Sequence, residues 1–329
     1  MAHMTEKTSD KILQYIHKRG QASGKELADH LASITDRGIR KQLKTLLEQG
    51  KLRKVGTPPR VYYFLANKTA HVVAPHITPK VERFIDERYI FISPTGDFVR
   101  GWKGFQLWCQ KTKQEPAKTA KEYVSTQMRY DKFREDGLID GTHKLKQTFD
   151  KVFLDRLFYL DFYSIERFGK TKRGQMLLYA NQSQDRRLIR GVVDEVRPMI
   201  EKVIKKNAID GVAFIPPTVK REVQFMKELE KQLRLPVRSL KVQKIKTAVV
   251  VPQKTLTKLV DRIENARQTM VVEDKGKYKN ILLIDDAVGS GATLNETAGQ
   301  IRRLGLVSGK IVGVSITGSF KGFDVISEV

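Results

Sequence analysis

Residues from about 150 to 320 alternate short apolar runs with longer amphipathic ones, and this alternation constrains the fold more than any other feature. Short apolar runs bounded by polar breaks are typical of buried strands in a parallel sheet, and amphipathic runs are typical of helices that cover its faces. The pattern predicts helices at 184–207, 219–233, 255–268 and 294–304, and strands at 173–180, 210–217, 246–251, 281–284 and 310–319. We therefore expect an α/β domain with its ligand at the carboxyl ends of the strands.

The segment "ILLIDDAVGSGAT", residues 281–293, combines several features at the end of one predicted strand. Two adjacent acids, Asp285 and Asp286, directly follow the apolar run. Small residues then lead into the next helix: Gly289, Ser290, Gly291, Ala292 and Thr293. Small side chains let backbone amides approach a ligand, and a helix N-terminus favours negative charge. The segment therefore predicts an anion site.

Three other motifs with similar components do not fit this segment. A Walker loop needs a Lys before its Ser or Thr, and a dinucleotide fingerprint needs G-x-G-x-x-G, which is absent as well. A response-regulator receiver also begins with paired acids, but it needs roughly 100 further residues. Only 43 residues follow Asp286.

The segment closely resembles the signature of type I phosphoribosyltransferases, with four apolar residues, two acids, a small-residue loop and a Thr. The resemblance implies that Asp285 and Asp286 bind the ribose hydroxyls of phosphoribosyl pyrophosphate or a nucleotide, and that they engage an accompanying Mg²⁺ only indirectly. It implies that the loop residues 289–293 hold the 5′-phosphate. In the 6-oxopurine enzymes of this family the fifth signature position is an acid, whereas here it is Gly289. Their proton chemistry on the base is therefore not expected in its usual form.

A wider resemblance covers most of residues 150 to 320. The stretch "VPQKTLTKLVDRIENARQ" is similar to a pattern in the competence protein F family of phosphoribosyltransferases, carried here by Gln253, Leu256, Arg262 and Asn265. The spacing from Gln253 to Arg262 is one residue longer than in that family. The resemblance implies that Arg262 contacts the ligand. It also implies that "AFIPPTVKR" is a pyrophosphate loop whose Lys220 or Arg221 reaches the leaving group; an exposed first helical turn is the alternative for these two residues.

Residues 1–66 contain three short amphipathic segments and then a basic hairpin pattern with a turn at 56–59. We expect Ser9, Ser23 and Thr35 or Asp36 to cap the three helices. The pattern resembles the winged helix-turn-helix family. The resemblance implies that the third helix enters a major groove, and that the hairpin contacts phosphates. The residues concerned are Arg37, Arg40, Lys41 and Lys44 in the helix, and Lys51, Arg53, Lys54 and Arg60 in the hairpin. A protein-interaction module is the alternative.

The charge balance limits the partners of the whole chain. The 329 residues include 61 Lys and Arg against 37 Asp and Glu, a formal charge of +24, which favours a polyanion such as nucleic acid, with DNA expected. One cysteine, Cys109, excludes an internal disulfide framework and fits a cytoplasmic protein. No apolar run predicts a membrane span. The sequence leaves the oligomeric state open, with a homo-oligomer as one option.

We therefore expect a multidomain chain of mixed α+β and α/β class: a winged helix at 1–66, a linker at 67–80, a small mixed region of unknown role at 81–149, and a phosphoribosyltransferase-like domain at 150–329. The aromatics of the mixed region favour core packing over a stacking platform for single-stranded nucleic acid; they are Phe98, Trp102, Phe105 and Trp108. Two functions remain open. One is an enzyme delivered to nucleic acid, resembling effectors proposed for retron-type antiphage systems. The other is a transcriptional regulator that senses phosphoribosyl pyrophosphate without catalysis.

Overall fold

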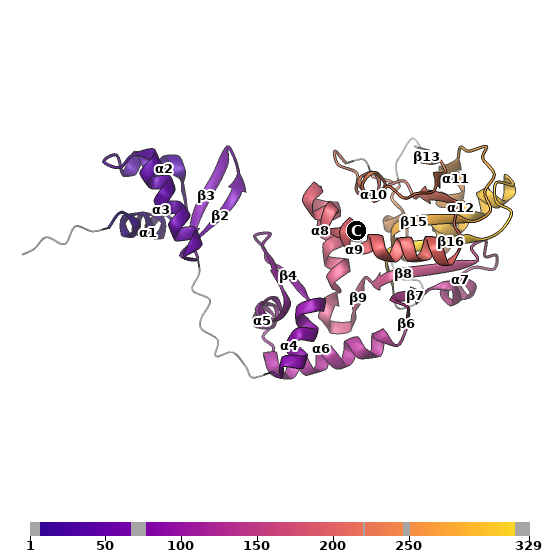
Figure 1. Cartoon of the computed structure of the whole chain (residues 1–329), viewed down its shortest axis with the longest axis horizontal. Helices are drawn as coiled ribbons and strands as arrows, with labels where there is room; N and C mark the ends of the chain where they lie inside the picture. Colours follow the sequence, from indigo (N-terminus) through magenta and orange to yellow (C-terminus); the bar gives the residue numbers. More distant parts are fainter. Residues whose placement is uncertain (1–6, 67–76, 220, 246–250, 320–329) are drawn as a thin grey trace, which may run out of the picture. The chain divides into compact units, whose positions relative to one another are not determined.

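A computed structural model describes residues 7–66, 77–219, 221–245 and 251–319 (Figure 1). The chain divides into two compact units. Unit 1 comprises residues 1–76 with 94–96, and unit 2 comprises residues 77–93 and 97–329. The described residues form twelve α-helices and several sheets, the largest of which has seven strands.

Unit 1 is a three-helix cluster with a small antiparallel sheet of order β1-β3-β2. Its elements are α1 (Thr8–Arg19), β1 (Ala22–Ser23), α2 (Gly24–His30), α3 (Asp36–Glu48), β2 (Leu52–Thr57) and β3 (Arg60–Leu65). Helical spacing of apolar residues buries one face of each helix, for example Ile12 and Ile16 in α1 and Leu43 in α3.

Side-chain caps fix where two of these helices begin. The Ser23 Oγ accepts a hydrogen bond from the Glu26 amide at 3.2 Å, and the Ser23 amide donates to Glu26 Oε2 at 2.7 Å, a complete capping box. The Thr35 Oγ1 accepts from the Gly38 amide at 3.2 Å. The Ser23 and Thr35 caps are therefore confirmed. The prediction for Ser9 is wrong, because α1 already begins at Thr8 and Lys7 is its N-cap.

Unit 2 is built on the seven-stranded sheet, whose order is β12-β11-β15-β16-β8-β7-β6. The first five strands run parallel and the last two are antiparallel additions at one edge. The bounds are β12 (Arg238–Ser239), β11 (Gly211–Phe214), β15 (Ile281–Val288), β16 (Ile311–Gly318), β8 (Arg156–Phe162), β7 (Leu138–Asp140) and β6 (Arg134–Glu135). The central strands β15 and β16 are almost wholly apolar up to their carboxyl ends, as expected for strands covered on both faces.

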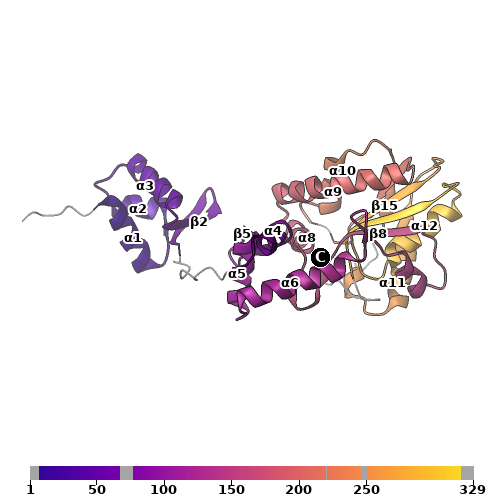
Figure 2. The same ribbon diagram turned by 60° about the horizontal axis from the view of Figure 1, so that its bottom comes forward.

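Helices cover both faces of this sheet. One face packs against α8 (Lys172–Ser183), α9 (Arg186–Lys206) and α10 (Phe225–Leu233), and the other packs against α11 (Leu259–Thr269) and α12 (Ala292–Arg303). Figure 2 shows α9 and α10 above the strands and α11 below them. Alternate residues of β15 divide between the two cores: Leu282 and Ile284 face the first set of helices, and Ile281 and Leu283 face the second.

Residues 77–149 belong to unit 2. They contribute the edge strands β6 and β7 and the elements α4 (Pro79–Arg88), β4 (Ile90–Ile92), β5 (Phe98–Arg100), α5 (Gly101–Lys111), α6 (Pro116–Asp131) and α7 (Thr142–Thr148). The boundary expected at residue 150 therefore falls inside one compact unit. The linker expected at 67–80 lies mostly outside the described residues, and α4 already begins at Pro79.

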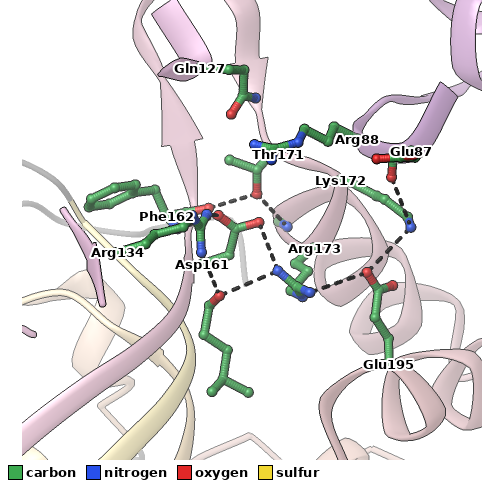
Figure 3. Close-up of polar contacts among 12 residues, drawn as sticks. Glu87, Arg88, Gln127, Arg134, Asp161, Phe162, Thr171, Lys172, Arg173 and Glu195 are labelled. Atoms are coloured by element: carbon green, nitrogen blue, oxygen red, sulfur yellow. Dashed lines mark hydrogen bonds and ion pairs between the residues drawn. The ribbon is translucent and has the colours of Figure 1, made fainter. Parts of the chain in front are cut away.

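A partly buried ionic cluster joins the edge strand β6 to β8 and to the helices α8 and α9 (Figure 3). Asp161, at the end of β8, pairs with Arg134 of β6, and its second oxygen lies 3.6 Å from Arg173 of α8. Arg134 also donates to the Leu160 carbonyl at 3.0 Å. Arg173 in turn lies 3.6 Å from Glu195 of α9. Asp161 is 7% exposed, so this cluster neutralises a carboxylate that would otherwise be costly to bury.

The sequence expectations for unit 2 have mixed outcomes. Residues 173–180 form part of α8 and not a strand, because Thr171 caps a helix there through the Gly174 amide at 3.1 Å. The first parallel strand is β8, which the sequence pattern did not single out. The expected strand 246–251 lies, except for Val251, outside the described residues. Core packing of the aromatics is confirmed for Trp102 and Phe105, whose rings stack at 5.8 Å, and Trp108 is partly buried against the same core. The expectation is wrong for Phe98, which is 39% exposed on the short strand β5.

Candidate functional site

A cavity of about 180 Å³ lies at the carboxyl ends of β11 and β15. The chain leaves β11 through α10 toward β12 on one side, and it leaves β15 through α12 toward β16 on the other. The two crossovers therefore diverge between these neighbouring strands. In an open α/β sheet this divergence creates the crevice in which ligands bind. The cavity is bordered by residues 215–219 after β11 and by residues 285–294, which span the carboxyl end of β15 and the start of α12.

The two adjacent acids belong to β15 itself, which extends four residues beyond the strand expected from the sequence. Both line the cavity. The Asp286 Oδ2 accepts a hydrogen bond from Asn181 Nδ2 of α8 at 3.3 Å. The Asp285 Oδ1 accepts from the Asp286 amide at 2.9 Å. The pair is thus held by the backbone on one side and by a helix of the first core on the other.

Lys244 supplies a positive charge to the same cavity. It lies on β13 (Val242–Lys244), which pairs with β14 (Met270–Val272), and its Nζ donates to Thr218 Oγ1 at 2.8 Å. Burial lowers the pKa of Lys244 to about 8, although the nearby Asp285 carboxylate acts in the opposite direction. Lys244 therefore connects the loop after β11 with the acid pair of β15.

The pKa of Asp285 is shifted in the opposite direction to that of Lys244. Burial raises the pKa of Asp285 well above its ordinary value, the neighbouring Asp286 carboxylate raises it further, and Lys244 counteracts both. One side of the residue still opens into the cavity. Two like charges at adjacent positions repel each other, so a ligand that donates hydrogen bonds to both carboxylates would relieve this repulsion.

The loop after the acids places a helix N-terminus against the cavity. Gly291 is the N-cap of α12 and has a φ of +88°, which glycine adopts without the strain that other residues incur. A Cβ at Gly291 would lie 2.7 Å from Leu145 Cδ2, so a larger residue requires this buried leucine to shift. Because Gly291 has no side chain, it cannot cap the first amides of α12. The Ala292 amide donates to a nearby side chain, Ser290 Oγ, at 3.3 Å.

Contacts farther along α12 hold this helix in place. The Asn295 side chain accepts from the Phe153 amide at 2.8 Å and donates to the Lys151 carbonyl at 2.9 Å. Glu296, which is 3% exposed, pairs with Arg267 of α11 at 3.1 Å. The N-terminus of α12 is therefore presented to the cavity by a helix that is anchored on two sides.

The three remaining ligand-binding residues inferred from the sequence have different outcomes. Arg221 lines the cavity and donates to the Asn181 carbonyl at the end of α8. Arg262 also lines it, but its Nε donates to the Leu256 carbonyl at 2.8 Å and its own carbonyl accepts from Gln253 at 2.9 Å. Arg262 thereby holds the segment before α11. Lys220 lies outside the described residues.

Sequence reasoning missed Lys244 and Asn181. Lys244 stands in "KVQKIK", a basic stretch without apolar alternation, so no pattern separated it from solvent-exposed lysines. Asn181 follows a segment that the sequence predicted as a strand, so its position beside Asp286 could not be anticipated. Both residues reach the cavity only through tertiary packing.

In unit 1 the cations chosen from the sequence lie on two adjacent elements. Arg37, Arg40, Lys41 and Lys44 are exposed on α3, on the side away from the buried Ile39 and Leu43. Lys44 has a weak pairing with Glu48 at 3.9 Å. Lys51, Lys54 and Arg60 are exposed on or beside the β2–β3 hairpin. Arg53 is half-buried, with its guanidinium 5.2 Å from the centre of the Phe64 ring.

The described ranges contain no group of three or more His, Cys, Asp or Glu side chains placed to hold a metal ion. Within the same ranges, no helix has both the length and the apolar character needed to cross a bilayer. No family model matches the sequence, and no curated protein matches it.

Proposed function

We propose that the unit 2 cavity binds phosphoribosyl pyrophosphate, and that the protein is a Mg²⁺-dependent phosphoribosyltransferase-like enzyme brought to nucleic acid by a winged helix in unit 1. One observation carries the proposal. The acid pair Asp285 and Asp286, the Lys244 ammonium and the N-terminus of α12 all line one cavity at the divergence point of the sheet.

The chemistry of the ligand matches these groups one by one. Vicinal hydroxyls of a ribose are donors, and Asp285 and Asp286 offer adjacent carboxylate acceptors, giving charge-assisted hydrogen bonds. A 5′-phosphate needs unobstructed amides and a positive field, which the loop 289–293 and the N-terminus of α12 supply. The pyrophosphate group needs cations, and Lys244 and Arg221 both line the cavity.

The residues present fit Mg²⁺ only as an ion that arrives with the ligand. Mg²⁺ prefers six oxygen ligands, and it commonly takes them from phosphates, water and one or two carboxylates. Asp285 and Asp286 offer carboxylates, but no third His, Cys, Asp or Glu completes a metal-binding group with them within the described ranges. When bound, the ion would neutralise charge on the pyrophosphate leaving group. The protein's own part is to hold the ribose and the 5′-phosphate while that group departs.

In the transfer itself, the bond from the ribose C1 to a pyrophosphate oxygen breaks and the electron pair leaves with pyrophosphate. A nucleophile on the acceptor forms the new bond to C1 and loses its proton to solvent. Gly289 provides no side chain for this proton, so the acceptor is not selected through an acid at that position. Lys244 would stabilise the negative charge that collects on the departing oxygens.

In unit 1, the exposed cations of α3 and of the hairpin support the nucleic-acid part of the proposal. Four of them occupy one helix on the side opposite its buried residues, and that element can enter a major groove. The hairpin cations lie on an adjacent element at which phosphates can be contacted. No acid occurs between Lys51 and Arg60 to oppose such contacts.

The test is to incubate the full chain with phosphoribosyl pyrophosphate, Mg²⁺ and a panel of bases and to measure pyrophosphate release. We expect release with at least one acceptor, and we expect the double variant Asp285→Asn/Asp286→Asn to abolish it. The variant Lys103→Gln, which alters an exposed lysine on α5, should retain the activity. Binding without release on any base would argue against the enzyme.

The acid pair also suits a second function, a regulator that senses phosphoribosyl pyrophosphate without turning it over. Sensing requires the same contacts with ribose and phosphate. In that case the ligand must change nucleic-acid affinity by a coupling free energy of roughly 1–3 kcal/mol, and nucleic acid must change ligand affinity by the same factor. A titration of fluorescent DNA with and without saturating ligand and Mg²⁺ distinguishes the two functions: a shift without turnover supports the sensor, and turnover without a shift supports the enzyme.

A further inference from the structure

Most of the excess positive charge lies outside unit 1. Residues 1–76 contain 14 Lys and Arg against 6 Asp and Glu, whereas residues 77–329 contain 47 against 31. The net charges are therefore +8 and +16. A winged helix in unit 1 leaves this larger excess unexplained. A surface of unit 2 on which this excess positive charge is concentrated would be a second binding site for a polyanion.

One such surface is a hollow between α9 and α10, on the helix layer that covers the first face of the sheet. Its volume is about 620 Å³. Five cations line it: Arg186, Arg190, Arg197, Lys231 and Arg234. Two acids, Asp194 and Glu228, also line it, so cations are in clear excess. The hollow lies outside the cavity that holds Asp285, and the two share no lining residue.

The hydrogen bonds and ion pairs of these five cations show which of them hold the helices together and which are available to bind a partner. Arg197 donates to the carbonyls of Gln232 and Leu233 at the end of α10, so it ties the two helices together. Arg186 lies 3.4 Å from Glu228, which neutralises that acid. Three other cations, Arg190, Lys231 and Arg234, are exposed and have no side-chain hydrogen bond or ion pair within the described ranges.

The backbone conformation of Arg234 supports the same conclusion. This residue is the C-cap of α10 and has a φ of +48°, in the left-handed region. Gly or Asn is usual at such a position, and the left-handed conformation is unfavourable for other residues. An arginine kept in a conformation that disfavours it is a reason to look for a role of its side chain. Here that side chain is on the rim of the hollow.

We propose that the α9–α10 hollow is a second nucleic-acid contact, which binds the phosphodiester backbone through Arg190, Lys231 and Arg234. The three cations come from two helices and border an open depression, which suits a chain of phosphates crossing it. A single small phosphate fits less well, because the Asp194 carboxylate also lines the hollow and would repel an anion settled inside it. The proposed contact involves phosphates and no base edges, so it adds affinity and salt dependence without sequence preference.

The test uses the full chain with the hairpin cations removed, as Lys51→Ala/Arg53→Ala/Lys54→Ala/Arg60→Ala, so that unit 2 accounts for a larger share of the remaining binding. Into this background are placed either Arg190→Glu/Lys231→Glu/Arg234→Glu or the control Lys103→Glu/Lys111→Glu/Lys205→Glu. The control makes the same change of charge at exposed lysines outside the hollow. Fluorescence anisotropy with labelled duplex and single-stranded DNA, repeated at several salt concentrations, measures affinity and its salt slope.

We expect the hollow variant to lose about tenfold or more in affinity for both probes, with a salt slope flattened by roughly 0.7–0.9 per lost phosphate contact. The control should lose several-fold less. Equal losses in the two variants would mean diffuse attraction, and no loss in the hollow variant would mean a solvated surface; either result overturns the proposal. So does displacement of the probe by inorganic phosphate at a concentration at which matched sodium sulfate and chloride have no effect.

This inference does not depend on the proposed enzyme. Binding of phosphoribosyl pyrophosphate, measured by calorimetry, should be unchanged in the hollow variant, because none of its three residues lines the cavity. Unchanged ligand binding together with lost DNA binding identifies a folded protein that lacks only the hollow contact. Absence of ligand binding in every variant would count against the cavity proposal and leave the comparison of DNA affinities valid.

Discussion

The cations of unit 1 and the charged groups of the unit 2 cavity represent two ways of presenting charge to a phosphorylated partner. On α3 and the hairpin, the cations are mostly exposed and attached to a small apolar core that does not depend on them. In the cavity, Lys244, Asp285 and Asp286 are packed among protein atoms and one another, and burial shifts the pKa of Lys244 downward and that of Asp285 upward.

The difference predicts how each region responds to change. An exposed charge in water contributes about 0–1 kcal/mol, so the cations of unit 1 act collectively and are weakened by salt. A buried charge whose partner is removed costs about 3–5 kcal/mol. Single substitutions should therefore have large effects in the cavity and small, similar effects in unit 1. The next three predictions test that contrast.

The largest effect is expected at Gly291. In Gly291→Val the left-handed φ is strained and the added Cβ would lie 2.7 Å from Leu145 Cδ2, so the loop or this buried leucine must shift. We expect ligand affinity to fall by about a hundredfold or more, with about 3 kcal/mol lost from the free energy of unfolding. The matched control is Gly137→Val, which has a similar φ of +83° and open space around its Cβ. Equal ligand affinity in the two variants, measured by calorimetry, would contradict this account of the loop.

A smaller effect is expected from pH. Below a pH of about 8 the Lys244 amine is protonated and can bind pyrophosphate oxygens, because burial sets its pKa near that value. Above it, the free protein loses this cation, so ligand affinity should fall by up to about tenfold per pH unit. Lys244→Arg keeps the charge at these pH values and should remove the decline. A parallel decline in the parent and in Lys244→Arg would show that another group is responsible.

The smallest effects are expected in the hairpin of unit 1. Replacing Lys51, Lys54 or Arg60 singly with Ala should weaken binding to all DNA sequences alike, by a few-fold each at low salt. Each replacement should flatten the slope of log affinity against log salt by about 0.9. The measurement is anisotropy with two unrelated duplexes. A change that depends on the sequence of the duplex would indicate base contacts, and no change in the triple variant would favour an interaction module.

The sequence was most informative where a local rule determines the structure. Ser23 with Glu26, and Thr35 with Gly38, mark helix starts through hydrogen bonds between near neighbours. The residues of β15, its acids and the start of α12 form one continuous stretch, so their order already implied a strand end facing a helix N-terminus. The local shape of the site could therefore be predicted.

What could not be predicted depends on packing between distant segments. Residues 173–180 are apolar enough for a strand, but the cap at Thr171 and the packing of α8 against α9 make them helical. Strand β8 shows no alternation because both of its faces are buried. Lys244 reaches Thr218, and Asn181 reaches Asp286, across separations of 26 and 105 residues. Neither contact leaves a periodic signal in the sequence.

The most direct test of the central claim is calorimetry of phosphoribosyl pyrophosphate with Mg²⁺ against the parent protein, Asp285→Asn and Asp286→Asn. Each replacement keeps the shape of the side chain and removes one charged acceptor from the cavity. The account predicts one site per chain in the parent, and a loss of roughly 1.5–3 kcal/mol of binding free energy in each variant, which is about ten- to a hundredfold in affinity. Unchanged binding in both variants, or no binding by the parent, would contradict it.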